Sequence, residues 1–152
     1  MTATTRRIVT GWNEAGEPGV LFAGPAPVTV DFGEAAASEL WLTAGEGEDV
    51  RARVDPAARE WQLEPPRGGS AFRVVTYRPG AEVGLHSTAT LDYIAVISGE
   101  LTLVLPDEEV TLRPGDALVQ RATPHGWANR SDVPCVMAAV LLDLPDEGEE
   151  AR

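Results

Sequence analysis

Short β-prone segments separated by glycine and proline run through most of this chain and constrain its fold more than any other feature. The sequence contains 15 glycines and 12 prolines, too many and too dispersed for long helices but typical of short strands joined by turns. We expect strands at residues 6–10, 20–23, 28–32, 39–43, 71–77, 91–98, 101–105, 110–112, 117–120 and 135–142. Strands at this even spacing, with no helical period between them, predict an all-β sandwich, jelly roll or barrel.

The turns are most readable in the second half of the chain. Gly99-Glu100 separates two expected strands and predicts a tight hairpin. Arg113-Pro114-Gly115-Asp116 has proline and glycine at the positions that a type II turn requires. Residues 44–70 are the least readable part, although Asp55 followed by Pro56 is typical of one capped helical turn.

The composition limits the classes of partner and the compartment. The 152 residues are enough for one domain with a core, not two. The formal net charge of −12 argues against nucleic acid or an anionic membrane as a partner, and residues 146–150 contribute to it as an expected solvated tail. Cys135 is the only cysteine, so no intrachain disulfide can form. No apolar stretch follows Arg6 and Arg7, and we expect a cytoplasmic protein without a signal peptide or membrane span.

His86 and His125 are the only histidines in the chain. His86, Thr88 and Asp92 have the same parity, so a continuous extended backbone would direct all three to one face. Asp92 lies in an otherwise apolar segment, where a carboxylate is costly to bury unless a cation, a metal ion or strong donors compensate it. On the residues alone, Asp92 either belongs to a site or lies at a strand end, where it caps a loop or pairs with an arginine.

The spacing of these residues resembles that of the cupin superfamily. The first cupin motif reads Gly, five residues, His-x-His, three or four residues, Glu, six residues, Gly; here Gly80, His86-Ser87-Thr88, Asp92 and Gly99 follow one another at the matching distances. The second motif opens with Gly-Asp, as Gly115-Asp116 does, and ends in His and Asn separated by three residues, as in His125-Gly126-Trp127-Ala128-Asn129. The resemblance covers about residues 72–142 and implies a double-stranded β-helix barrel with the motif residues inside its mouth.

The chain also departs from the cupin pattern. Thr88 replaces the second histidine of the first motif, and the shorter Asp92 replaces its glutamate. Residues 120–124, Gln-Arg-Ala-Thr-Pro, stand in place of the usual proline and glycine of the second motif, and Gly115 lies one residue closer to His125 than is usual. The sequence is similar to a branch of small bacterial cupins with which no single reaction is associated, so the resemblance predicts the fold better than the function.

The resemblance implies that His86, Asp92 and His125 form the ligand set, with Thr88 as a weak fourth member. Two imidazoles and one carboxylate suit Fe(II), Zn²⁺ or Mn²⁺, with positions left open for water or substrate. Alternatively, the site lacks a metal ion and the same three residues act directly as acid and base. Further candidates for lining the pocket are Gln120, Arg121 and Trp127, for which an ordinary strand face or a packing role is the competing interpretation.

We therefore predict a single cupin domain over residues 1–152, with N-terminal strands and loops at 1–70, the barrel core at 71–143 and an acidic tail at 144–152. The expected function is metal-dependent lyase or isomerase chemistry on an organic acid, carbonyl or polyketide-like compound. The alternatives are a non-haem Fe(II) dioxygenase that uses the same residues and a non-catalytic module that binds a small ligand. The resemblance further implies a homodimer.

Overall fold

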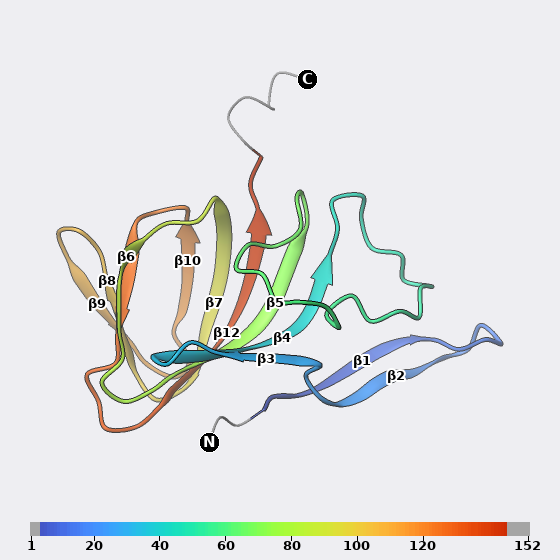
Figure 1. The fold of residues 1–152 in the computed structure, drawn as a ribbon, viewed down its shortest axis with the longest axis horizontal. Coiled ribbons are helices and arrows are strands. Elements are labelled where there is room, and N and C mark those ends of the chain that lie inside the picture. The colour runs from blue at the N-terminus through green and yellow to red at the C-terminus, as the bar shows by residue number, and fades with distance from the viewer. Residues whose placement is uncertain (1–3, 146–152) are drawn as a thin grey trace.

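The computed structural model describes residues 4–145. Over that range the regular secondary structure consists of β-strands, without helices (Figure 1). The strands are β1 (Arg6–Trp12), β2 (Pro18–Pro25), β3 (Val28–Asp31), β4 (Ala35–Thr43), β5 (Ser70–Tyr77), β6 (Glu82–His86), β7 (Thr90–Ser98), β8 (Leu101–Val104), β9 (Glu109–Leu112), β10 (Ala117–Arg121), β11 (His125–Ala128) and β12 (Cys135–Asp143). They form a hairpin of β1 and β2, a six-stranded sheet in the order β10-β7-β12-β5-β4-β3, and a four-stranded sheet in the order β6-β11-β8-β9. The predicted all-β barrel with extra N-terminal strands is confirmed.

Buried and more exposed side chains alternate along the central strands of the six-stranded sheet, and the buried ones form its inner face. In β7, Thr90, Asp92, Ile94 and Val96 are buried, whereas the residues between them are half-buried or exposed. The neighbouring β12 alternates in the same way, with its buried side chains at Cys135, Met137, Ala139 and Leu141. Because successive side chains of a strand point to opposite faces, one face of this antiparallel sheet packs on the core.

The four-stranded sheet closes the barrel over that inner face. Trp127 of β11 and Leu101 of β8 belong to the same buried cluster as Ile94 and Met137 of the six-stranded sheet. Full burial of an apolar side chain of this size contributes about 1.5–3 kcal/mol. Contacts between the two sheets therefore form the main core and place the ends of β6, β7, β10 and β11 around a common interior.

Gly99-Glu100 forms a corner between the sheets, so the predicted hairpin is wrong. The strand before it, β7, lies in the six-stranded sheet, and β8 after it lies in the four-stranded sheet. Gly99 has a φ of 71°, and a Cβ there would collide with the carbonyl oxygen of Pro134, so only glycine fits. The predicted type II turn is present: Gly115 has a φ of 91°, and the Asp116 N–H donates to the Arg113 carbonyl over 2.9 Å.

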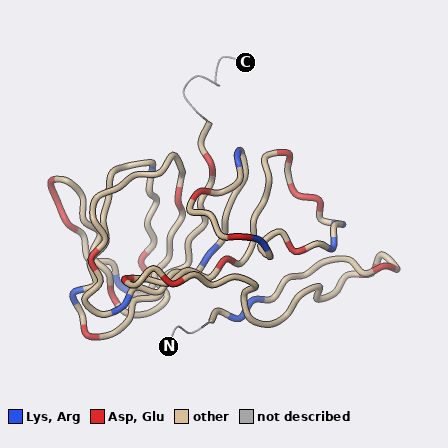
Figure 2. Tube along the Cα trace, viewed as in Figure 1, with Lys and Arg blue, Asp and Glu red and all other residues tan. Residues whose placement is uncertain are grey.

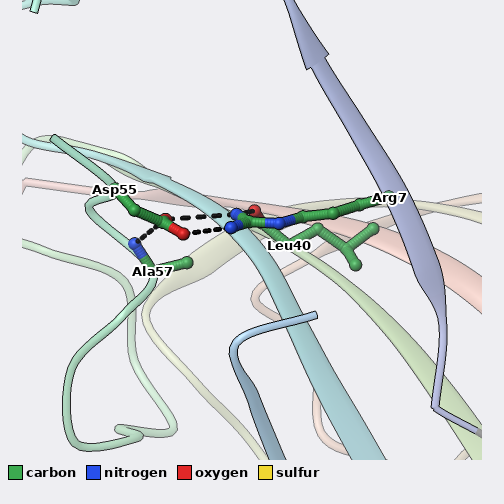
Figure 3. Close-up of polar contacts among 4 residues, drawn as sticks. All are labelled: Arg7, Leu40, Asp55 and Ala57. Atoms are coloured by element: carbon green, nitrogen blue, oxygen red, sulfur yellow. Dashed lines mark hydrogen bonds and ion pairs between the residues drawn. The ribbon is translucent and has the colours of Figure 1, made fainter. Parts of the chain in front are cut away.

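Arg7 ties the β1–β2 hairpin to the rest of the molecule (Figure 3). Its guanidinium donates to the Leu40 carbonyl of β4 at 2.7 Å and pairs with both carboxylate oxygens of Asp55, one of them at 3.1 Å. Asp55 also accepts a hydrogen bond from the Ala57 N–H at 3.0 Å. Asp55 thus caps a turn as expected, but the turn does not become helical. The loop of residues 44–69 is in this way fixed against the hairpin.

Two strands, β6 and β11, were not among the predicted segments, and both carry a histidine of the site. Acidic residues gather at the β1–β2 turn, at the β8–β9 turn and in the loop after β4, as Figure 2 shows. The expected acidic run at 146–150 lies outside the described residues. Within residues 4–145, the structure has no helix of the length and apolar character needed to span a membrane.

Candidate functional site

The two histidines face each other across neighbouring strands. His86 at the end of β6 is the register partner of His125 at the start of β11, and their ring centroids lie 4.4 Å apart. His125 is buried, with 4% of its surface exposed, whereas His86 is exposed. Antiparallel pairing therefore brings together two residues that are far apart in the sequence, one on the inside of the barrel and one at its mouth.

Both imidazoles are oriented by backbone carbonyls. His86 Nδ1 lies 2.9 Å from the Gly84 carbonyl oxygen, and His125 Nδ1 lies 2.8 Å from that of Thr123. A carbonyl oxygen can only accept, so in each ring Nδ1 carries the hydrogen and the neutral ring presents an unprotonated Nε2. Burial is the largest influence on the pKa of His125 and lowers it; nearby His86 lowers it too, while the Thr123 carbonyl and Asp92 act in the opposite direction. Burial and the hydrogen bond that Gln120 Nε2 donates to His125 Nε2 favour the neutral ring of His125.

Gln120 links His125 to Asp92. Gln120 of β10 is the register partner of Asp92 of β7, and its Nε2 lies 3.0 Å from His125 Nε2 and 3.4 Å from Asp92 Oδ2. The side-chain amide thus donates to both groups. Asp92 Oδ1 is buried and has no hydrogen-bond partner, which leaves one carboxylate oxygen uncompensated.

Of the other candidate residues, Trp127 packs against this group, whereas Thr88 lies in a connection and Arg121 is exposed. Thr88 lies in the connection between β6 and β7, where its hydroxyl is 2.8 Å from that of Thr90. His86 and Asp92 therefore lie in different sheets, and the single continuous strand implied by their parity is not formed. Arg121 is exposed on the opposite face of β10 from Gln120. Trp127 is buried and packs between Tyr77 and His125, at centroid distances of 5.9 and 5.5 Å.

A direct three-ligand cluster is not present among the described residues. Within residues 4–145, no three His, Cys, Asp or Glu side chains lie close enough together to hold one metal ion. His86 and His125 are in contact, but Asp92 reaches His125 only through the amide of Gln120. Of the sequence-predicted residues, the structure joins His86, His125, Gln120 and Asp92 into one chain of contacts.

A cavity of about 340 Å³ opens beside His86. Val83 and Trp127 from the cupin motifs line it together with His86, and residues from outside the motifs complete it: Phe32, Glu34, Ala35, Ala37, Trp61, Leu63, Arg73, Val75 and Tyr77. A cavity of this size lies at the small end of the range for small-molecule sites. A larger hollow of about 880 Å³ lies between the β1–β2 hairpin and β4, and neither histidine lines it.

Most of this cavity was not predicted from the sequence. Phe32, Trp61 and Arg73 are separated by long stretches and belong to no motif. Trp61 lies in residues 44–70, which were the least readable part of the chain. The sequence signals were His86 itself and Trp127, which was a pocket candidate two residues after His125.

Comparisons with known proteins agree with this architecture. The model of the Cupin_2 family, a cupin domain, matches residues 73–142. The cupin-domain-containing oxidoreductase fogC of Aspergillus ruber is 44% identical over 53% of this chain and 41% of its own length. The cupin-domain-containing oxidoreductase srdD of Neurospora crassa is 32% identical over 92% of this chain and 76% of its own length. The chain thus spans less than half of fogC and about three quarters of srdD.

A solved structure shows the same fold at low sequence identity. The cupin 2 conserved barrel domain protein of Salinispora arenicola superimposes with a TM-score of 0.50 and 17% identity, over 72% of this chain and 76% of that one. The chain therefore belongs to the cupin superfamily.

Proposed function

We propose that this chain is a small-molecule enzyme that moves a proton on a carbonyl or enol substrate, by lyase or isomerase chemistry. The observation that carries the proposal is the pair of contacting imidazoles, each with Nδ1 oriented by a backbone carbonyl so that the neutral ring presents Nε2 as the acceptor. An oriented, unprotonated Nε2 beside a ligand-sized cavity is the arrangement that a general base needs. His86 is the one of the two that lines the cavity.

The chain's own residues divide this work. Nε2 of His86 would accept a proton from the carbon next to the substrate carbonyl, and the electron pair of the broken C–H bond would pass into the enolate. The same nitrogen would then return the proton to another atom of the conjugated system. His125 packs against His86 and is held by Gln120, which fixes the position of both rings. Trp127 and Tyr77 exclude water from the inner end of the cavity. The overall reaction is redox-neutral, so it needs no co-substrate.

The donor types of His86, His125 and Asp92 suit a divalent metal ion, but the three side chains do not lie close enough together in this structure to hold one. His86 and His125 present unprotonated nitrogens, and Asp92 Oδ1 is a buried acceptor without a partner that a cation would satisfy. His86, Asp92 and His125 would hold the ion, and the amide of Gln120, which lies between Asp92 and His125, would have to turn or move. When bound, Fe(II), Zn²⁺ or Mn²⁺ would polarise a carbonyl oxygen of the substrate.

A second candidate is oxidation, because relatives of this chain are named as cupin-domain-containing oxidoreductases. A non-haem Fe(II) dioxygenase would use the same two histidines and one carboxylate. The two functions differ in what they consume: the dioxygenase takes up dioxygen, and the proton shift does not.

Solvent deuterium exchange tests the proposal directly. The probe is 1-tetralone, a bicyclic aryl ketone with exchangeable hydrogens next to its carbonyl, followed by NMR in D₂O with protein prepared without chelator and analysed for metal. We expect exchange above the buffer rate, lost in His86→Gln and kept in Ser87→Ala, whose side chain is exposed beside it. Exchange that is unaffected by His86→Gln would refute the role of His86. Iron together with substrate-dependent dioxygen uptake would support the dioxygenase function. Ligand binding without either reaction would indicate a binding module.

A further inference from the structure

Four of the twelve residues that line the cavity beside His86 are Phe, Tyr or Trp. Phe32 and Trp61 pack together on one side with ring centroids 4.9 Å apart, and Tyr77 and Trp127 pack on another at 5.9 Å. Aromatic rings favour flat partners that stack or meet them edge to face. The shape and the surface chemistry of the cavity therefore suit a flat, largely apolar ligand.

The one arginine that lines the cavity is already neutralised. Arg73 pairs with Glu39 through Nε–Oε1 at 3.2 Å and Nη2–Oε2 at 2.9 Å, and both side chains are 4% exposed. Its remaining hydrogen bonds go to the carbonyls of Leu63 at 2.9 Å and Gln62 at 3.3 Å. Arg73 is thus occupied by a carboxylate and by backbone, so it offers little attraction to an anionic ligand.

The surroundings disfavour negative charge as well. Glu34 lines the same cavity, and the whole chain carries a formal net charge of −12. A ligand carboxylate would lose its hydration in this cavity without gaining a free cationic partner among the lining residues. The charges on the walls therefore favour an uncharged ligand over an organic acid.

Trp61 lines the same cavity as His86 and is held in place by Arg73. The Arg73 guanidinium lies 5.1 Å from the centre of the indole ring and also binds the two carbonyls that follow Trp61 in the chain. The indole Nε1 is buried and has no hydrogen-bond partner. Trp61 therefore contributes a fixed ring to the cavity wall, and its unpartnered N–H could donate to a ligand oxygen only after the side chains that cover it move.

We propose that this cavity binds an uncharged, flat aromatic or conjugated molecule that carries a hydroxyl or carbonyl oxygen, and that Trp61 determines this specificity. The inference rests on the proposed function in one respect, because it takes the cavity beside His86 to be the substrate site. It narrows the substrate to neutral aryl or conjugated ketones, enols and phenols. Binding itself requires no catalysis, so it can be tested separately from the proton transfer.

Titration calorimetry with three probes of one skeleton tests the proposal. The probes are 2-naphthol, which is neutral and flat, 2-naphthoate, which is flat but charged, and decahydro-2-naphthol, which is neutral but not flat. We expect 2-naphthol to bind at least about tenfold more tightly than 2-naphthoate and roughly 3- to 10-fold more tightly than the saturated alcohol. Equal or tighter binding of 2-naphthoate would overturn the proposal.

Substitutions locate the binding site. Trp61→Leu should weaken 2-naphthol binding by roughly 3- to 10-fold. Trp61→Phe should retain the affinity that comes from the aromatic ring and lose the affinity that comes from the indole N–H. Trp41→Leu is the matched control, because Trp41 lines the larger hollow by the β1–β2 hairpin. Loss of binding in Trp41→Leu, or unchanged binding in both folded Trp61 variants, would refute the assignment. Binding as predicted without 1-tetralone exchange would reject the proposed reaction while keeping the binding site.

Discussion

Gln120 lies directly opposite Asp92 across the β10–β7 ladder and donates to its Oδ2 over 3.4 Å while its Nε2 also lies 3.0 Å from His125 Nε2. One side-chain amide thus serves as the donor to a buried carboxylate and to a buried imidazole. In the family pattern these two acceptors would belong to the ligand set itself. In this structure, Gln120 therefore sets the relative position of Asp92 and His125.

Replacement of Gln120 by leucine should destabilise the protein by about 1–3 kcal/mol, because two buried acceptors lose their donor while the side-chain volume is roughly kept. Val110→Thr is the control: Val110 of β9 lies in the other sheet and is 43% exposed, so its replacement should change stability little. Urea unfolding followed by tryptophan fluorescence measures both. Equal stability of Gln120→Leu and wild type would show that the amide is not needed by the folded state.

Asp92→Asn should reduce the metal content of the protein. The substitution keeps the shape of the side chain and its contact with Gln120 but removes the charge that would compensate a cation, and loss of a ligand should weaken metal affinity by at least about tenfold. Elemental analysis after dialysis against Zn²⁺ or Mn²⁺ provides the measurement. Asp107→Asn, at an exposed turn, is the control. An Asp92→Asn protein that retains the metal of the wild type would remove Asp92 from the ligand set.

The buried Glu39–Arg73 pair should behave differently from an exposed pair. Burial raises the pKa of Glu39 even though Arg73 acts to lower it, so removal of Arg73 alone leaves a poorly solvated carboxylate. We expect Arg73→Met to cost about 3–5 kcal/mol of stability, and Glu39→Leu combined with Arg73→Met to recover at least about 1 kcal/mol of that loss. Arg130→Met, which breaks the exposed pair with Glu109, should have only a small effect. Additive losses in the double variant would contradict the coupling.

Cys135 should be unreactive in the folded protein. The residue is fully buried, and burial, with a smaller contribution from Glu100, raises the pKa of its thiol to about 11. Because the thiolate is the reactive form, a raised pKa lowers the rate of alkylation at any given pH below it. Iodoacetamide at about pH 8 should label the denatured chain and leave the native chain unlabelled. Rapid labelling of the native protein would mean that β12 opens readily.

The outer face of the six-stranded sheet should join two copies of the chain, and we propose a homodimer through it. Tyr93 and Val119 are register partners on this face, and they and Ile97 are 48%, 58% and 55% exposed. The outward side chains of β7 carry no charge, although the chain is strongly acidic, so a second copy can bury them without placing carboxylates together. Light scattering should give the mass of two chains, reduced to one by Val119→Lys but not by Val110→Lys on the other sheet. A monomeric wild-type protein would refute the proposal.

The strands could be predicted from the sequence where apolar and polar residues alternate between turns. They were missed where a strand forms mainly because it pairs with a segment that is distant in the sequence. Each predicted strand overlaps an observed one, because burial on one face imposes a period of two on the sequence. The missed strands β6 and β11 are short and contain Gly84 and Gly126, which lower their local β-signal. At Gly126 a side chain would crowd the backbone of β6, so glycine is required there by a neighbour that is distant in sequence.

For the site, spacing identified the histidines, but their surroundings depended on strand register. Gly99 predicts a sharp turn, but the same turn can join two paired strands or lead from one sheet into another. Which of the two forms depends on the whole fold, and here β7 and β8 lie in different sheets. Gln120 was one of several pocket candidates, and only the β10–β7 register places it between Asp92 and His125. The cavity could not be predicted, because Phe32, Trp61 and Arg73 meet only when three distant segments have folded together.

The attachment of the hairpin by Arg7 has a consequence for ligand binding. Asp55, which Arg7 holds, lies in the same loop as Trp61, so one guanidinium connects the N-terminal arm to the segment that forms a cavity wall. A ligand that stabilises this loop then favours the docked arm, and anything that stabilises the docked arm favours ligand binding by the same factor. The attachment of the β1–β2 hairpin and the wall of the cavity thus depend on the same loop.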